Sequence, residues 1–437
     1  MKLTRGLYSA LLTLISPVLL WKISKEGTEQ NKFSERLGYT PALPIKPVIW
    51  LHAASVGEVI AATPLIHKLQ REYENHLLLV TTMTATGARQ ARKALKGQGT
   101  HLLLPLDLPW VASRFLDNVK PEVAVFMETE LWPNLIHGCH KREIPFIIAN
   151  GRLSEKSMHH YQHRMGPVIA EVLKEVTAIA AKSDKDAHSF VELGAPAEKV
   201  IVTGTIKFDV VPAIGLEDKA SALREQMFAE RPVWVAGSTH PGEDERILAA
   251  HDLVRERYPD AVLILVPRHP QRFDSVAELL EREEVAFTRR SSDNDFTDEH
   301  SVLLADTMGE LMLMYAMSDV AFVAGSLKPV GGHNLLEPAC LSKPVLSGGY
   351  LFNFQDVADL FDEQEALIRC DDSGDLSQQI TDLLSNDERR EEMGQKALSV
   401  VEKNRGALER QFQLIRTSLI AAEQRKNESE QAQTVEE

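Results

Sequence analysis

The sequence predicts an α/β protein built from two successive parallel-sheet domains. Short apolar runs alternate with amphipathic stretches of helix length, first over about residues 48–203 and again over about 233–346. Nearly continuous apolar strands separated by helices are typical of parallel sheets covered on both faces. A chain of 437 residues also exceeds one ordinary hydrophobic core. We therefore expect two domains of about 200 residues each that face a cleft.

The apolar runs give the expected strands. Residues 210–231 contain no such run and have an early Pro and Gly, so the domain connection is expected there. In the first domain the strands are Val48–His52, Leu77–Thr82, Leu102–Pro105, Val123–Met127, Phe146–Ala149, Ile179–Ala181 and Val200–Thr203. In the second they are Val233–Ala236, Ala261–Val266, Val302–Ala305, Val320–Ala324 and Pro344–Leu346.

The expected domain limits are 1–24 for an N-terminal anchor, 25–210 for the first domain and 211–422 for the second. Residues 423–437 are mostly polar and have almost nothing to bury, which predicts a disordered tail.

An uncharged apolar run, residues 6–21, lies between Arg5 and Lys22. It is shorter than the roughly 20 residues that cross a bilayer, although Tyr8 and Trp21 are placed like interfacial anchors. No small-x-small cleavage site follows, so we interpret the run as a retained anchor lying in or across the inner leaflet rather than as a signal peptide. A helix belonging to the soluble fold is the alternative.

Charge and absent motifs exclude several classes of protein. A formal net charge of -15 argues against nucleic-acid binding, although residues 1–50 hold seven Lys or Arg against three Glu. The dinucleotide, P-loop, nucleophile-elbow and HExxH motifs are missing, which argues against dehydrogenases, NTPases and hydrolases. His159 and His163 have helical spacing but no third ligand nearby, so no metal site is predicted.

The stretch WLHAASVGEVIAATPLI, residues 50–66, changes from strand to helix at Ser55-Val56-Gly57-Glu58. Ligands of open α/β sheets bind beyond the carboxyl ends of the strands, and a helix start offers free N–H groups and a positive dipole end. We expect Glu58 to be ionised and only modestly basic, and to accept a proton from a substrate hydroxyl. The alternative is a carboxylate that only stabilises its own helix.

Two further strand ends of the first domain carry charge. In VFMETELWPN, residues 125–134, Glu128 and Glu130 follow a strand. Together with the strand end that carries Glu58, this makes two acidic strand ends. They favour a site for a hydroxyl-bearing acceptor, because capping one helix does not need both. Lys207 in GTIKFD follows the last strand and could neutralise an anionic leaving group, or be a surface lysine.

The second domain has three strand-end motifs suited to anions. LVPRHP places Arg268 at a strand end, where it suits phosphate or carboxylate, and DTMGEL, residues 306–311, opens a helix able to bind phosphate. GGHNLLEP, residues 331–338, offers backbone N–H groups for phosphate and Glu337 for ribose hydroxyls. The same string is compatible with a capping box made by Asn334 and Glu337.

These motifs, in this order, resemble the 3-deoxy-D-manno-octulosonic acid (Kdo) transferases of lipopolysaccharide assembly, inverting glycosyltransferases with the GT-B fold of two Rossmann-like domains. The matching strings are HAASVGE, TTMTATG, METELWPN, IANGRLS, GTIKFD, LVPRHP, DTMGEL and GGHNLLEPA, from residue 52 to about 340. Leu335 stands where the family often has Pro, a change from which we expect little loss.

The resemblance implies the substrates and the residue roles. CMP-Kdo would be the donor and a lipid A precursor the acceptor, at the cytoplasmic face of the inner membrane, with no metal needed. Glu58 would accept the proton, while Glu128 and Lys207 would stabilise the transition state. CMP would be held by Pro267, Arg268, Met308, Gly309, Glu310, Asn334, Leu335, Leu336 and Glu337.

Other functions fit the same residues. One is another GT-B protein that uses a UDP-sugar, such as a transferase or an epimerase, and competition by CMP but not UDP would separate it. Another is a two-domain sugar-nucleotide binding protein, which would show no turnover. A membrane-associated scaffold would leave the acidic strand ends without a role.

Overall fold

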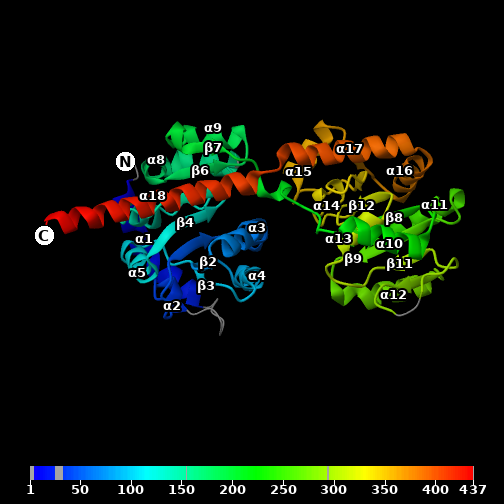
Figure 1. Cartoon of the computed structure of the whole chain (residues 1–437), viewed down its shortest axis with the longest axis horizontal. Coiled ribbons are helices and arrows are strands. Elements are labelled where there is room, and N and C mark those ends of the chain that lie inside the picture. The colour runs from blue at the N-terminus through cyan, green and yellow to red at the C-terminus, as the bar shows by residue number, and fades with distance from the viewer. Residues whose placement is uncertain (1–3, 25–32, 154, 293–294, 437) are drawn as a thin grey trace. The chain divides into compact units, whose positions relative to one another are not determined.

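The computed structural model describes residues 4–24, 33–153, 155–292 and 295–436. They form two compact units: unit 1 runs to Lys207 and resumes at Arg405, and unit 2 spans Phe208–Asn404. Each unit is one parallel sheet with helices on both faces (Figure 1). The predicted pair of parallel α/β domains is therefore confirmed.

The sheet of unit 1 has seven parallel strands in the order β3-β2-β1-β4-β5-β6-β7. The strand order reverses between β1 and β4, whose register pairs His52 with Phe126. The two strands therefore end side by side at the edge where open α/β sheets bind ligands. The strands are β1 Val48–His52, β2 Leu77–Thr82, β3 Thr100–Leu103, β4 Pro121–Met127, β5 Phe146–Gly151, β6 Ala178–Ala181 and β7 Val200–Val202.

Helices cover both faces of this sheet with apolar side chains. One face packs against α3, α4 and α18, and the other against α5, α6, α8 and α9. The helices of unit 1 are α1 Arg5–Ser24, α2 Phe33–Arg36, α3 Val56–Glu72, α4 Ala85–Leu95, α5 Pro109–Val119, α6 Pro133–Lys141, α7 Glu155–His160, the π-helix η1 Tyr161–Met165, α8 Gly166–Glu175, α9 Asp184–Glu192, η2 Ala197–Lys199 and α18 Ala407–Glu436, with η3 Ile206–Phe208 at the unit boundary.

Unit 2 repeats the design with the strand order β10-β11-β9-β8-β12-β13-β14, which reverses between β8 and β12. Its strands are β8 Val233–Thr239, β9 Val262–Pro267, β10 Phe287–Arg289, β11 Val302–Leu304, β12 Val320–Val323, β13 Val345–Ser347 and β14 Leu367–Arg369. Its helices are α10 Leu216–Phe228, α11 Asp244–Arg257, η4 Pro270–Arg272, α12 Phe273–Arg282, α13 Leu311–Met317, α14 Leu336–Ala339, α15 Gln355–Glu363, α16 Ser373–Ser385 and α17 Asp387–Asn404.

The C-terminal part of the chain differs from the prediction. The second domain was expected to continue to residue 422, but α18 belongs to unit 1, where Phe412, Ile415 and Leu419 join the core beside β1 and β4 (Figure 1). The tail expected to be disordered after residue 423 continues this helix to Glu436. Its Ala, Glu, Gln and Lys content and its lack of Gly and Pro favour a helix.

The strands β10 and β14 were not predicted. Each has three residues at a sheet edge, and only Thr288 in β10 and Leu367 in β14 are buried. Each ends in a charged Arg, so neither forms a continuous apolar run that the sequence would show.

The N-terminal helix α1 docks by its first turns and exposes apolar side chains beyond them. Tyr8 packs against the core of unit 1. Five exposed residues follow at helical spacing, namely Leu11, Leu14, Ile15, Val18 and Trp21, which we call the α1 stripe. In the part of the chain that the structure describes, no helix combines the length and hydropathy needed to cross a bilayer.

Candidate active site

Glu58 lies in the first turn of α3, directly beyond the end of β1. Ser55 is the N-cap residue, and its hydroxyl accepts the Glu58 N–H at 3.3 Å. The Glu58 carboxylate in turn accepts the Ala54 N–H at 2.8 Å and the Ser55 hydroxyl at 2.9 Å. The geometry of a helix-capping carboxylate is therefore present, and it also fixes where this side chain lies.

The electrostatics of Glu58 correct the prediction of a fully ionised, weak base. Burial, which has the largest effect, and the negative charges of Glu130 and Glu128 together raise its pKa to about 7, against the opposing hydrogen bonds from Ala54 and Ser55. The local sequence showed only the capping donors and the helix end, both of which favour the anion. A carboxylate with a pKa near neutrality is a stronger base that is still available at physiological pH.

Glu128 is the first residue beyond β4, the neighbour of β1. Its φ of 58° is left-handed, a costly conformation for a residue with a side chain. Its carboxylate lies 3.2 Å from the Lys182 ammonium, which is 7% exposed and follows β6 directly. The sequence analysis did not predict a role for Lys182. Its position immediately after an apolar run could have indicated one.

The acidic loop, residues 128–132, also places Glu130. Its carboxylate accepts the Trp132 indole N–H at 2.8 Å and lies 3.6 Å from Nε2 of the buried His52. Although burial disfavours the anion, His52 and Trp132 hold the pKa of Glu130 below its ordinary value. A charged Glu130 therefore stands beside a Glu58 that gives up its proton less readily.

Lys207 follows β7, which lies three strands away from β4 in the sheet. After β7, however, the chain turns back toward the ends of β4 and β5. The Ile206 N–H donates to Oδ1 of Asn150 at the end of β5, at 3.3 Å. The Ile206 side chain is buried in the same core as Met127 of β4 and Ala149 of β5. Unit 1 thus gathers its three predicted catalytic residues at the carboxyl edge of the sheet: Glu58 and Glu128 on neighbouring strands, and Lys207 tied to β5.

In unit 2, Arg268 and Glu337 interact electrostatically from different strand ends. Arg268 is exposed after the buried Pro267, and its N–H donates to the Thr239 carbonyl at 3.1 Å. Burial raises the pKa of Glu337, whereas Asn334 and the charge of Arg268 lower it.

The capping box considered for the GGHN string is not formed. The Asn334 amide donates to Oε1 of Glu337 at 3.2 Å, and its Oδ1 accepts the N–H of Leu336, two residues on, at 3.2 Å. The N-cap residue of α14 is Leu335 rather than Asn334, so Glu337 lies at N2 and the N3 residue is Pro338, which cannot complete the box. Leu335 is fully buried and packs in the core of unit 2.

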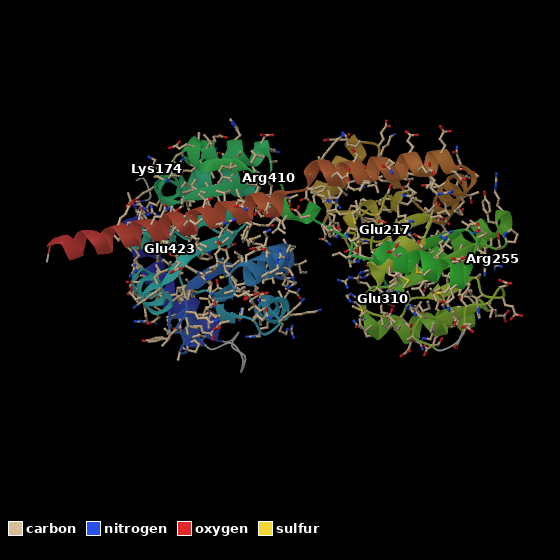
Figure 2. All side chains as sticks on the ribbon, viewed as in Figure 1. Lys174, Glu217, Arg255, Glu310, Arg410 and Glu423 are labelled. Atoms are coloured by element: carbon tan, nitrogen blue, oxygen red, sulfur yellow. The ribbon has the colours of Figure 1, made fainter. Side chains whose placement is uncertain are left out.

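The DTMGEL turn holds Glu310 between a hydroxyl and a cation. Thr307 donates to the Glu310 carboxylate at 2.6 Å, and a guanidinium nitrogen of Arg290 lies 3.2 Å from it. Figure 2 labels Glu310 on this unit. Met308 is exposed, and Gly309 has a φ of 88°, which favours glycine. The turn therefore presents backbone and thioether surface to solvent while its carboxylate is held.

Sequence reasoning missed Glu243, which ties together the strand ends where the sheet of unit 2 reverses. This fully buried carboxylate accepts N–H groups from Gly325, Ser326 and Leu327 after β12, at 2.7–2.9 Å. It also accepts the N–H of His240 after β8, at 3.0 Å. The carboxylate thereby supplies the hydrogen-bond acceptor for four backbone N–H groups that follow the two strands.

A histidine pair adjoins this anchor. Nε2 of His240 lies 2.9 Å from Nε2 of His333, and the two rings stack at 5.0 Å. Burial, with help from neighbouring cations, lowers the pKa of both, that of His333 to about 4. Two neutral rings make this contact when one donates its Nε2–H to the unprotonated Nε2 of the other. Across the described residues, no group of three or more His, Cys, Asp or Glu side chains is arranged to hold a metal ion.

Comparison with known proteins identifies the class. The family model described as 3-Deoxy-D-manno-octulosonic-acid transferase (kdotransferase) matches residues 31–210, and that described as glycosyl transferases group 1 matches residues 233–400. The UDP-GlcNAc 2-epimerase of Neisseria meningitidis shares the fold, with a TM-score of 0.54 at 14% identity over 86% of this chain and all of the epimerase. The two parallel-sheet domains are those of a glycosyltransferase with the GT-B architecture.

Relatives with higher sequence identity show which family within this class the chain belongs to. The 3-deoxy-D-manno-octulosonic acid transferase of Haemophilus influenzae is 40% identical over 422 residues, which cover 95% of this chain and 99% of the relative. The C-terminal CMP-Kdo binding domain of WaaA from Acinetobacter baumannii is 37% identical over 43% of this chain and 99% of that domain, with a TM-score of 0.42. The chain belongs to the family of the Kdo transferases.

Glu243→Gln is expected to lower the free energy of unfolding of unit 2 by about 3 kcal/mol, because the Gln amide group would face backbone N–H donors in a buried site. Scanning calorimetry should show the transition of unit 2 moving down while that of unit 1 stays. Glu245→Gln changes an exposed carboxylate in the first turn of α11, the helix that Glu243 precedes, so it is the matched control and should change little. Equal stability of the two variants would contradict this role for Glu243.

Proposed function

We propose that this Kdo transferase moves Kdo from CMP-Kdo to a lipid A precursor, a phosphorylated and acylated glucosamine disaccharide, with Glu58 as the general base. The observation that carries the assignment is the position of Glu58: its carboxylate lies at the strand–helix junction where the sheet reverses, with a pKa of about 7. Membership of the family supplies the transferred sugar.

In the proposed reaction, Glu58 takes the proton from a glucosamine hydroxyl as that oxygen attacks the anomeric carbon of Kdo. CMP leaves from the opposite face, so the configuration inverts. General-base help of this kind contributes roughly 10²- to 10⁴-fold in rate. The hydrogen bonds from Ala54 and Ser55 hold the carboxylate in one orientation, which favours attack along one line.

The charges of the transition state would be balanced by protein groups without a metal. Glu128 would stabilise positive charge that develops on the sugar ring, and its ion pair with Lys182 supports this role by holding the carboxylate in position. Lys207 and Arg268 are proposed to meet the negative charge on the departing CMP. The Glu337 carboxylate would accept hydrogen bonds from the ribose hydroxyls. The other donor contacts are assigned to Pro267, Met308, Gly309, Glu310, Asn334, Leu335 and Leu336.

We also propose that α1 holds the protein at the cytoplasmic face of the inner membrane by lying in the lipid interface. The α1 stripe supports this, because Leu14 and Val18 are 76% and 68% exposed in a region with a local basic excess. The acylated acceptor resides in the same layer, so the proposed arrangement brings enzyme and substrate together.

Transfer is tested by mass spectrometry of a lipid A precursor incubated with the full-length protein and CMP-Kdo. Added Kdo masses are expected for the wild type. Glu58→Ala is expected to bind CMP as the wild type does while transfer falls by at least about 100-fold. An active Glu58→Ala enzyme would remove the base assignment, and transfer from a UDP-sugar instead would replace the donor.

The pH dependence of kcat/KM tests the electrostatics of Glu58. Because the protonated carboxyl cannot accept a proton, activity is expected to fall about tenfold per pH unit below pH 7 and to reach a plateau above it. Glu130→Gln removes a negative neighbour, which lowers the pKa of Glu58 and moves the acidic limb to lower pH. An unmoved limb in this variant would show that Glu130 does not act on the base.

Flotation with vesicles containing anionic lipid tests the membrane contact. The double variant Leu14→Glu, Val18→Glu is expected to remain unbound, because two charges replace the apolar centre of the α1 stripe. Ile45→Glu, a fully exposed apolar residue elsewhere on unit 1, is the matched control and should float with the wild type. Flotation of the double variant would exclude the stripe as the contact.

A further inference from the structure

The helix that follows the acidic loop is capped from a distant part of the chain. Trp132 occupies the N-cap position of α6 but makes no capping hydrogen bond with its side chain. The cap comes from Asp107, in the loop after β3, whose two carboxylate oxygens accept the N–H groups of Asn134 at 3.0 Å and Leu135 at 2.8 Å. Asp107 therefore fixes the point at which the acidic loop ends and α6 begins.

The first turns of α1 contact this cap directly. The Tyr8 hydroxyl donates to Oδ2 of Asp107 at 3.0 Å. Ser9 and Arg5 donate to Oδ1 of Asn134 at 2.9 and 3.3 Å, and the Asn134 amide donates to the Asp107 carbonyl at 2.6 Å. Five side chains from three separate segments thus form one network at the start of α6.

This network is buried and charged, so its parts depend on one another. Asp107 is 1% exposed, and burial raises its pKa to about 7 against the bonds from Asn134, Leu135 and Tyr8 and the charge of Arg5. Burial also raises the pKa of Tyr8, so its hydroxyl stays a donor. Removing one partner leaves a buried polar group unpaired, which costs more than the bond itself contributes.

The acidic loop is held at a second point by Tyr161 of η1. Its hydroxyl donates to the Thr129 carbonyl at 3.3 Å. Tyr161 also lies close enough to both Tyr8 and Glu130 to interact with them electrostatically. The loop that carries Glu128 and Glu130 is therefore held between α1, the loop after β3 and η1.

We propose that Asp107 and Tyr8 are positioning residues for sugar transfer: through them, the first turns of α1 set the place of Glu130 and Glu128 beside the base Glu58. The inference rests on the function proposed for Glu58. It makes α1 part of the framework of the active site, in addition to its proposed contact with lipid. Loosening the cap would let the acidic loop move away, which would lower the pKa of Glu58 and weaken the base.

Tyr8→Phe and Asp107→Asn test this in the full-length protein. Tyr8→Phe removes one hydroxyl and leaves the acceptor of both α6 N–H groups in place, so it serves even where Asp107→Asn does not fold. Tyr39→Phe is the matched control, because Tyr39 is exposed and its ring stacks with the guanidinium of Arg114 in α5. None of the three substitutions alters the α1 stripe, so vesicle binding should be unchanged.

Two readouts separate positioning from a merely structural role. Hydrogen exchange of the Asn134 and Leu135 amides should speed up about tenfold or more in Asp107→Asn and by a smaller factor in Tyr8→Phe. With CMP-Kdo and a lipid A precursor, kcat per folded enzyme should fall severalfold, the KM for CMP-Kdo should stay, and the acidic limb of the pH profile should move to lower pH. The control should match the wild type in both.

A pH limb and kcat that match the wild type in Tyr8→Phe and in folded Asp107→Asn would overturn the proposal. Unchanged exchange at Asn134 and Leu135 would also overturn it, and this measurement does not depend on activity. A wild-type protein that transfers no Kdo would instead refute the proposed function. The two failures are therefore distinguishable.

Discussion

The site of each unit depends on where its parallel sheet reverses strand order. At that point neighbouring strands are followed by connections that run to opposite faces, so the loops at their carboxyl ends diverge and leave room for a ligand. In unit 1 the reversal lies between β1 and β4, and it places Glu58 next to the acidic loop. In unit 2 it lies between β8 and β12, where Glu243 holds both loops.

The two units surround a buried carboxyl group with opposite environments. The Glu243 carboxylate accepts four backbone N–H groups, and these hydrogen bonds fix the loops around it. Burial and two nearby carboxylates disfavour the anion of Glu58, against the hydrogen bonds from the Ala54 N–H and the Ser55 hydroxyl. One environment gives rigidity and the other gives basicity, at a cost in stability that is common at catalytic groups.

The sequence predicted the residues that follow strands, and it missed their partners. Glu58 and Glu128 could be found because a local pattern, a strand that ends in a polar turn, marks the functional edge of a sheet. Lys182 lies 54 positions from Glu128, and Asp107 lies 99 from Tyr8, so no local period reports these pairs. The raised pKa of Glu58 likewise depends on residues brought close only by β-sheet pairing.

Most of the fold was predictable because local patterns mark the strands. The prediction failed where packing between distant segments determines the structure. Apolar runs gave twelve of the strands, including the three-residue edge β7. The edges β10 and β14 each end in Arg and lack a complete apolar run, so they are stabilised by their neighbours rather than by their own pattern. The helical pattern of Phe412, Ile415 and Leu419 shows that α18 has an apolar face, but not which of two sheets this face covers.

The return of α18 to unit 1 has a consequence for biosynthesis. The ribosome completes the strands of unit 1 first, then the whole of unit 2, and only then the helix that covers β4 and β5. At about 5–20 residues per second, the sheet of unit 1 waits roughly 10–40 s with one apolar face incomplete. During this interval the nascent chain has an exposed sheet face next to a domain that can already fold, a window in which chaperones would have most to protect.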